Sequence, residues 1–302
     1  MTLVTRGAPI ILQAERMQRV EARMERLQAQ IATGRRFTAP SEDPALANRA
    51  ALLERLETVA AARARVIERA DTRLALAETA IDGVSGALMR LRELALSGAN
   101  GTLSASDRAV VAAEVRALGA QVLDLANVRD EAGRFLFAGA ADAAPAYAPD
   151  AEGGPVVWRG AGAGPGAEAA GVGGAQVPRG PDVFGRDADG LFASIDALLE
   201  ALSEPDDASR AEAMATALSG LEAAFDRATT ARARIGAARA RLEAEQEQLA
   251  AARLDIARGL AATSGLDLTE AIAALRALGL TLAASQQAFG QIFRFSLFDR
   301  LG

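Results

Sequence analysis

Three short stretches of the sequence carry residue types that could do chemistry. Residues 160–166, Gly-Ala-Gly-Ala-Gly-Pro-Gly, have the glycine density of a phosphate-binding loop, but no strand leads in, no helix start follows, and Pro165 interrupts the run. Residues 187–190, Asp-Ala-Asp-Gly, have part of a calcium-loop pattern, but Gly185 stands where the first aspartate would be. We therefore interpret the first stretch as a surface loop and the second as a turn that caps a helix beginning at Leu191.

The third stretch holds Glu243, Glu245 and Glu247, which could suggest a pair of catalytic acids. The nearby Arg239 and Arg241 favour a solvated helix face instead, supported by pairs such as Arg239 with Glu243. The chain has no histidine and no cysteine, so the commonest general base, thiol nucleophiles and the usual metal ligands are all missing. We expect a protein that is not an enzyme, with no catalytic residues, no metal site and no cofactor.

The overall composition argues against a large globular core. Of 302 residues only 4% are aromatic, and the 33 basic residues, all arginine, are outnumbered by 39 acidic ones. The net charge of −6 with interspersed signs argues against nucleic acid as a partner, because binding the phosphate backbone needs clustered positive charge. The first apolar patch is too short for a secretory signal. Asp267, Glu270 and Arg276 break the most apolar stretch, so we expect no membrane span.

Two long hydrophobic stripes, with steps of three and four residues, dominate the two halves of the chain. Such narrow stripes are typical of helices that pack along a partner helix. The first stripe has one gap, filled by Arg63, and consists of Leu53, Leu56, Ala60, Ile67, Ala70, Leu74, Ala77, Ile81, Val84, Leu88, Leu91 and Ala95. The second is interrupted by Arg232, Arg239, Gln246 and Arg253, and consists of Met214, Leu218, Leu221, Phe225, Ala228, Ile235, Leu242, Leu249, Ile256 and Leu260.

These patterns predict a mainly α fold, in which the N- and C-terminal halves form a long antiparallel helical coiled-coil rod with a small β-containing middle domain. A third helix, capped by Ser104 or Ser106, should turn back on the first long one. A short strand is expected at residues 155–159. The other helices are expected at about residues 10–32, 43–97, 191–202, 207–262 and 269–293.

The predicted organisation has five parts. An N-terminal assembly segment and a C-terminal assembly segment flank the two halves of the rod, and the outer domain lies between those halves. In chain order the parts are the N-terminal assembly segment (1–42), the first half of the rod (43–134), the outer domain (135–190), the second half of the rod (191–262) and the C-terminal assembly segment (263–302).

Both ends of the chain are more apolar than termini usually are. Four of the ten phenylalanines lie in the last fourteen residues. A monomer whose long helices pack on each other offers little to bury these ends, so we interpret them as assembly surfaces. The candidate residues are Leu12, Val20, Met24, Leu27, Ile31, Leu282, Phe289, Ile292, Phe293, Leu297 and Phe298.

Several blocks of sequence resemble the bacterial flagellin family. The N-terminal signature is similar at residues 27–35, Leu-Gln-Ala-Gln-Ile-Ala-Thr-Gly-Arg, and at residues 41–45, Ser-Glu-Asp-Pro-Ala. A second block is similar over residues 88–95 and 111–127, and the ending resembles the family at residues 296–299, Ser-Leu-Phe-Asp. The blocks occur in family order at both ends, and the resemblance covers about residues 1–140 and 190–302.

Within the family, residues 127–139 and the compact middle are more similar to the hook-associated members that join hook to filament than to flagellins that form the filament. The resemblance implies a structural role at the hook–filament junction, and a short filament-forming flagellin is the alternative. A cytosolic coiled-coil scaffold would explain the heptads but not the Ser-Leu-Phe-Asp ending.

The resemblance also implies how such a subunit assembles. Terminal helices without a partner in their own chain would be largely disordered in the free subunit and would fold as subunits stack in a ring or helical lattice. The implied partners are further copies of the chain, the neighbouring hook-associated protein, flagellin, and a cytosolic export chaperone on the C-terminal helices. The implied location is the extracellular flagellum, reached by type III export without a cleaved signal peptide.

Overall fold

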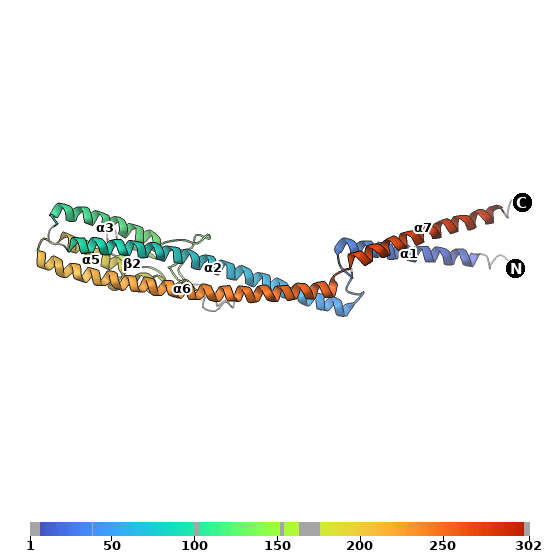
Figure 1. Cartoon of the computed structure of the whole chain (residues 1–302), viewed down its shortest axis with the longest axis horizontal. Helices are drawn as coiled ribbons and strands as arrows, with labels where there is room; N and C mark the ends of the chain where they lie inside the picture. The colour runs from blue at the N-terminus through green and yellow to red at the C-terminus, as the bar shows by residue number, and fades with distance from the viewer. Residues whose placement is uncertain (1–6, 38, 100–102, 152–153, 163–175, 299–302) are drawn as a thin grey trace. The chain divides into compact units, whose positions relative to one another are not determined.

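The computed structural model describes residues 7–37, 39–99, 103–151, 154–162 and 176–298, with only the backbone at 7–11 and 291–298 (Figure 1). The chain forms two compact units: unit 1 comprises residues 1–60 and 250–302, and unit 2 comprises residues 61–249. The predicted mainly α class with a small β-containing middle is confirmed. The five-part division stays a prediction, since two units do not test its boundaries.

The helices begin and end within a few residues of the predicted positions, except that the last is longer at its end. Pro44 opens the second helix at a position where a missing N–H costs nothing. The predicted strand is β2, which pairs antiparallel with β1. The elements are α1 Gly7–Thr33, α2 Pro44–Gly98, α3 Ala105–Ala126, β1 Tyr147–Pro149, β2 Val156–Trp158, α4 Gly180–Phe184, the 3₁₀ helix η2 Asp187–Asp189, α5 Leu191–Ser203, α6 Asp207–Ser264 and α7 Leu268–Phe298.

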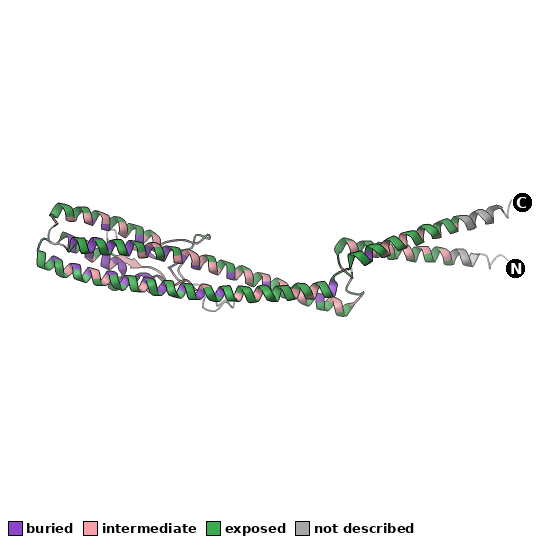
Figure 2. Cartoon of the chain, viewed as in Figure 1, coloured by how far each residue is buried: buried purple, intermediate pink, exposed green. Residues whose placement is uncertain are grey.

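Unit 2 is built on the antiparallel pair of α2 and α6, with α3 returning along α2 as predicted (Figure 1). The return of α3 is fixed by Arg90, whose Nε lies 2.6 Å from the Glu114 carboxylate, and by Leu125, which covers Gly83. Helix α5 packs against α3. The buried residues form one continuous hydrophobic core through these helices and the β region (Figure 2).

The buried seam of α6 differs from the predicted stripe at alternate positions. Leu218 is only half-buried, and Phe225 is 39% exposed. Alanines one residue earlier are buried in their place, because a small side chain lets neighbouring helices approach closely. The seam consists of Met214, Ala217, Leu221, Ala224, Ala228, Ala231, Ile235, Ala238 and Leu242.

The arginines that interrupt the heptads form ion pairs between α2 and α6. Arg239 of α6 donates to Asp71 at 2.9 Å and to Glu78 at 2.8 Å, and these hydrogen bonds raise the pKa of its guanidinium. Arg232 pairs with Asp82 at 2.8 Å, while Arg63 of α2 pairs with Glu245. The predicted pair of Arg239 with Glu243 is therefore wrong, because carboxylates on α2 take that arginine. The order of the pairs fixes the antiparallel direction of the two helices.

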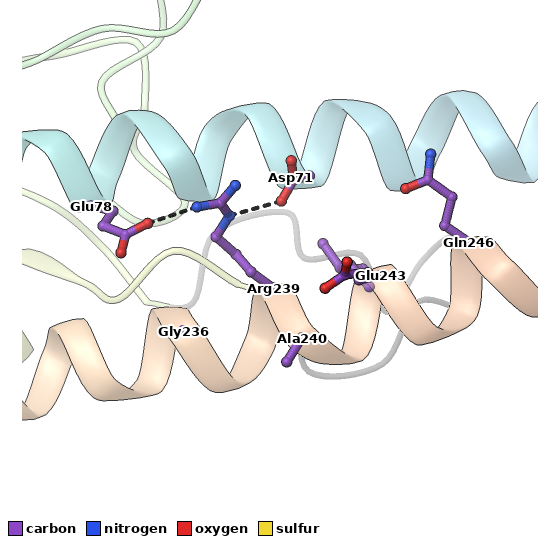
Figure 3. Close-up of a pocket in the computed structure, with 8 residues that line it drawn as sticks. Asp71, Glu78, Gly236, Arg239, Ala240, Glu243 and Gln246 are labelled. Atoms are coloured by element: carbon purple, nitrogen blue, oxygen red, sulfur yellow. Dashed lines mark hydrogen bonds and ion pairs between the residues drawn. The ribbon is translucent and has the colours of Figure 1, made fainter.

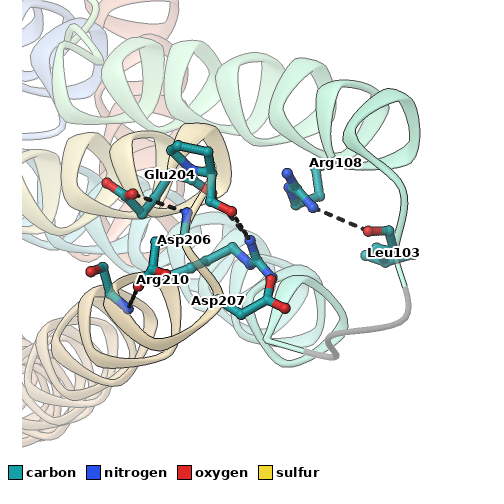
Figure 4. A network of polar contacts seen from close by, with 8 residues as sticks. Leu103, Arg108, Glu204, Asp206, Asp207 and Arg210 are labelled. Carbon is teal, nitrogen blue, oxygen red and sulfur yellow. Dashed lines mark hydrogen bonds and ion pairs between the residues drawn. The ribbon is translucent and has the colours of Figure 1, made fainter.

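The turn between α5 and α6 confirms the predicted break at Pro205 (Figure 4). Arg210, which is 3% exposed, reaches back and donates to the Glu204 carbonyl at 3.1 Å. Asp206 accepts from the Ser209 N–H at 2.9 Å, which lowers the pKa of its carboxyl. The guanidinium thus satisfies a carbonyl at the end of α5 that no helix turn can reach.

The β region is anchored by an aromatic cluster. Phe184 lies 5.2 Å from Phe137 and 5.4 Å from Tyr147, measured between ring centroids, and both contacts are edge-on. The Tyr147 hydroxyl donates to the Gly185 carbonyl at 2.8 Å, and burial raises the pKa of that hydroxyl. Asn127, at the end of α3, donates to the Tyr147 carbonyl at 2.8 Å. Strand β1 is therefore held by both the cluster and α3.

The alanine seam yields a stability prediction. Ala231 is 1% exposed, so Ala231→Leu should lower the free energy of unfolding by about 1–3 kcal/mol, because extra methylene groups must displace packed neighbours. The exposed Ala233→Leu is the matched control and should change it by less than about 0.5 kcal/mol. Urea unfolding followed by the single tryptophan, Trp158, measures both. Equal midpoints for the two variants would contradict close packing at this seam.

Candidate assembly surfaces

The described residues of the stretches that could have done chemistry take structural roles. Residues 187–189 form η2 and Gly190 caps α5, as the turn interpretation predicted; Asp187 adopts a φ of 49°. Ala161 forms a parallel bridge with Gly139, and residues 163–166 of the glycine run lie outside the described residues. Among the described residues, no group of three acids is placed to hold a metal ion.

The groove nearest to Glu243 is a structural ion-pair site. It encloses about 450 Å³ between α2 and α6. Figure 3 shows Arg239 reaching across the groove between Asp71 and Glu78, while Glu243 stays on its own helix. Arg239 hydrogen-bonds to both carboxylates that α2 contributes to the groove, which gives them a structural role in joining the two helices. We assign this groove to the pairing of the helices.

The candidate assembly surfaces lie in unit 1, where two connectors hold its helices together. Gly34, with a φ of +66°, ends α1 as predicted. The following N–H of Arg36 donates to the Ser264 carbonyl at 2.8 Å, and the Leu266 N–H donates to the Gly34 carbonyl at 3.1 Å. The α1–α2 connector is thereby tied to the α6–α7 connector. This tie places the end of α1 beside the start of α7.

Helices α1 and α7 lie side by side and pack on each other within this unit (Figure 1). The expectation that the terminal helices have no partner in their own chain is therefore wrong: each is the other's partner. No local sequence signal reports this contact, because the two helices are more than 230 residues apart.

The packing of α1 on α7 covers the predicted surface only in part. Four of its residues, with steps of three and four, are half-buried: Val20, Met24, Leu27 and Ile31. Leu282 and Phe289 of α7 are also half-buried, whereas Leu12 is 51% exposed. The side chains of Ile292, Phe293, Leu297 and Phe298 lie outside the described residues, so their role stays a prediction.

The interior of unit 1 contrasts with that of unit 2. Its buried side chains, among the described residues, are small: Ala50, Ala60, Thr263, Ser264 and Ala271. Unit 2 also exposes Met89, Leu96, Val110 and Phe225, but it buries phenylalanine, leucine, isoleucine and methionine in its core. In unit 1 no large apolar side chain among the described residues is buried, and such side chains remain exposed on every one of its helices. The exposed residues are Leu12, Leu52, Leu56, Val59, Leu254, Leu268, Ile272 and Leu280. Unit 1 thus presents the apolar surface that a protein interface needs.

Most of these exposed residues were not among the predicted assembly residues. Leu52 and Val59 lie seven residues apart on α2, beside the predicted hydrophobic stripe. Leu268 and Ile272 lie four residues apart at the start of α7. A search for a second apolar stripe parallel to the main one would have found them.

Helix α7 bears on the reason given for expecting no membrane span. By length and composition alone, residues Leu268–Gly290 could cross a bilayer, and only 6% of the window is buried. Glu270 and Arg276 are the only charges between positions 268 and 290, too few to break the run. Length and composition do not distinguish a membrane span from a helix that is covered by a protein partner.

Comparisons with known proteins found similarity over parts of the chain. Residues 10–142 match the family described as the bacterial flagellin N-terminal helical region. Flagellar hook-associated protein 3 of Salmonella typhimurium is 34% identical over 119 residues, which cover 39% of this chain and 38% of that protein. The chain thus aligns with less than two fifths of this curated relative.

Solved structures share the fold at low identity. A putative flagellar hook-associated protein from Vibrio parahaemolyticus superposes with a TM-score of 0.59 at 22% identity, covering 74% of this chain and 99% of the other. The flagellar junction protein FlgL from Legionella pneumophila superposes with a TM-score of 0.55 at 16% identity, covering 73% and 100%. These likenesses confirm the fold, and the family match confirms the predicted resemblance of the N-terminal blocks, over residues 10–142.

Proposed function

We propose that this chain, which carries the N-terminal helical region of bacterial flagellins at residues 10–142, is a structural subunit that joins the flagellar hook to the filament. The proposal is supported by the curated relative named flagellar hook-associated protein 3 and by the shared fold of the junction protein. Self-assembly through unit 1 is the mechanism. The small β-containing middle domain would face outward.

The exposed apolar surface of unit 1 is the observation that carries this proposal. Leu280 is 74% exposed and Val59 is 61% exposed, although α1 and α7 already pack on each other. Burying such side chains contributes about 25 cal/mol per Å² of apolar area, a gain available only when another chain covers them. Stacked copies would bury these faces, so assembly supplies the core that unit 1 lacks.

Two alternatives are less well supported. A short flagellin would share the N-terminal match, but the curated relative and the solved structures named above are hook-associated or junction proteins. A cytosolic coiled-coil scaffold would explain the helices but not the flagellin match at residues 10–142.

The partners follow from the same proposal. Further copies of the chain would cover unit 1, and the neighbouring hook-associated protein and flagellin would contact the two ends of the ring. A cytosolic chaperone would shield the apolar α7 before export, since a surface of this kind favours aggregation. Export to the extracellular flagellum would proceed without a cleaved signal peptide.

Deletion of the gene is the direct test of the junction role. Electron microscopy should show hooks without attached filaments, and flagellin should accumulate in the medium. Complementation with the full chain should restore the filaments. Deletion cells that still carry filaments would overturn the junction role. Deletion cells that keep an intact junction but have no filament would identify the protein as filament flagellin.

A further inference from the structure

One stretch of α6 is strongly basic in an otherwise acidic unit. Residues 227–242 contain five arginines and no acidic residue. In unit 2 as a whole, acidic residues outnumber arginines by 28 to 19. The prediction of evenly interspersed charges missed this stretch, because it was made from the balance over the whole chain.

Three of these five arginines have partners within unit 2. Arg232 pairs with Asp82, and Arg239 pairs with Asp71 and Glu78 across the helix pair. Arg227 donates to the Asp189 carbonyl at 3.1 Å. Arg232 and Arg239 are thus paired with carboxylates of α2, and Arg227 holds α6 against η2.

The remaining two arginines, Arg234 and Arg241, are exposed and line one groove of about 330 Å³. Within the described part of the chain, neither has a carboxylate within ion-pair distance. They lie seven residues apart and thus about 10 Å apart along the same face of α6. Ala237 and Ala238 leave the space between them open.

The opposite wall of the groove comes from the segment that leads into α4. Val177 and Pro178 make it apolar, and Arg179 adds a third guanidinium. Asp182 is the single acid among the lining residues and already accepts from Arg179 at 3.1 Å. The groove therefore combines apolar walls with an excess of two positive charges.

We propose that this groove binds a short acidic segment of another protein, with two carboxylates about 10 Å apart. Guanidinium forks match carboxylates in geometry and charge, and the apolar walls suit the stems of glutamate side chains. A long polyanion fits less well, since the acidic remainder of unit 2 would repel it. This inference does not depend on the proposed assembly role.

Binding of a labelled helical peptide with two glutamates seven residues apart tests the proposal on the full chain. Fluorescence anisotropy at low salt should show binding that is lost when the glutamates are replaced by glutamine. Arg234→Gln combined with Arg241→Gln should weaken binding at least about tenfold, as expected for two charge-assisted contacts. Asp182→Asn, which removes the competing acid, should strengthen it severalfold.

Arg258→Gln is the matched control, because it removes one exposed arginine of unit 1 that pairs with Asp255. This control should bind the peptide as the unchanged chain does. Equal binding by the double variant would overturn the proposal. Tighter binding of heparin than of the peptide, lost in the same double variant, would assign the groove to polyanions instead. A different sedimentation coefficient of the double variant, measured without peptide and compared with the unchanged chain, would assign the groove to contact with a second copy of the chain.

Discussion

Leu280→Asp should leave the free subunit folded and abolish its incorporation into flagella. The side chain is 74% exposed in α7, so a carboxylate there stays hydrated in the monomer. In an assembly that covers this face, the same carboxylate would be buried without a partner, at a cost of several kcal/mol for each subunit. Because each copy in a ring would suffer this cost, we expect no detectable junctions by electron microscopy.

The control is Gln286→Asp, which adds the same charge at an exposed position on a different side of α7. Circular dichroism should show unchanged helix content for both variants, and the control should assemble. Normal incorporation of the Leu280→Asp variant would show that this face of α7 is not part of the assembly surface. Loss of helix in the free variant would show that Leu280 already has a partner inside the subunit.

Phe184→Ala should lower the free energy of unfolding of unit 2 by about 3–5 kcal/mol, because it leaves a cavity in a fully buried cluster. The ring contacts Phe137 and Tyr147 edge-on, so these contacts are lost together with the buried area. Urea unfolding followed by circular dichroism measures the change.

Phe225→Ala is the matched control, since the same atoms are removed at a position that is 39% exposed. We expect a loss below about 1.5 kcal/mol for this variant. A similar loss for both variants would mean that the aromatic cluster is not the main anchor of the β region.

Sequence periodicity predicted the helices well, because long heptad stripes and sharp breaks such as Pro205 are local signals. The seam of α6 was assigned to Leu218 and Phe225 because they are more hydrophobic than alanine. The packing instead favours Ala217 and Ala224, whose small side chains allow close approach. Hydropathy alone could not make this distinction, since it ranks side chains by polarity and not by the distance between helices.

The residues that we propose for assembly differ in part from those predicted from the sequence. The apolar ends pointed to unit 1, and the half-buried Val20 and Leu27 do lie on α1 there. The pairing of α1 with α7 left no trace in local patterns, because it joins opposite ends of the chain. Leu52 and Val59 were missed because they lie beside a stripe that had already been assigned to the helix pair.

The tie between the two connectors of unit 1 has a consequence for how the subunit is made. The Arg36 N–H needs the carbonyl of Ser264, so a chain still being synthesised cannot complete unit 1 until its last segment has appeared. All of unit 2, by contrast, is one continuous stretch between these two partners and can close earlier. Chains that terminate after unit 2 but before Ser264 would therefore contain a folded unit 2 and an incomplete unit 1. Such chains would lack the proposed assembly surface and could not be added to a growing structure.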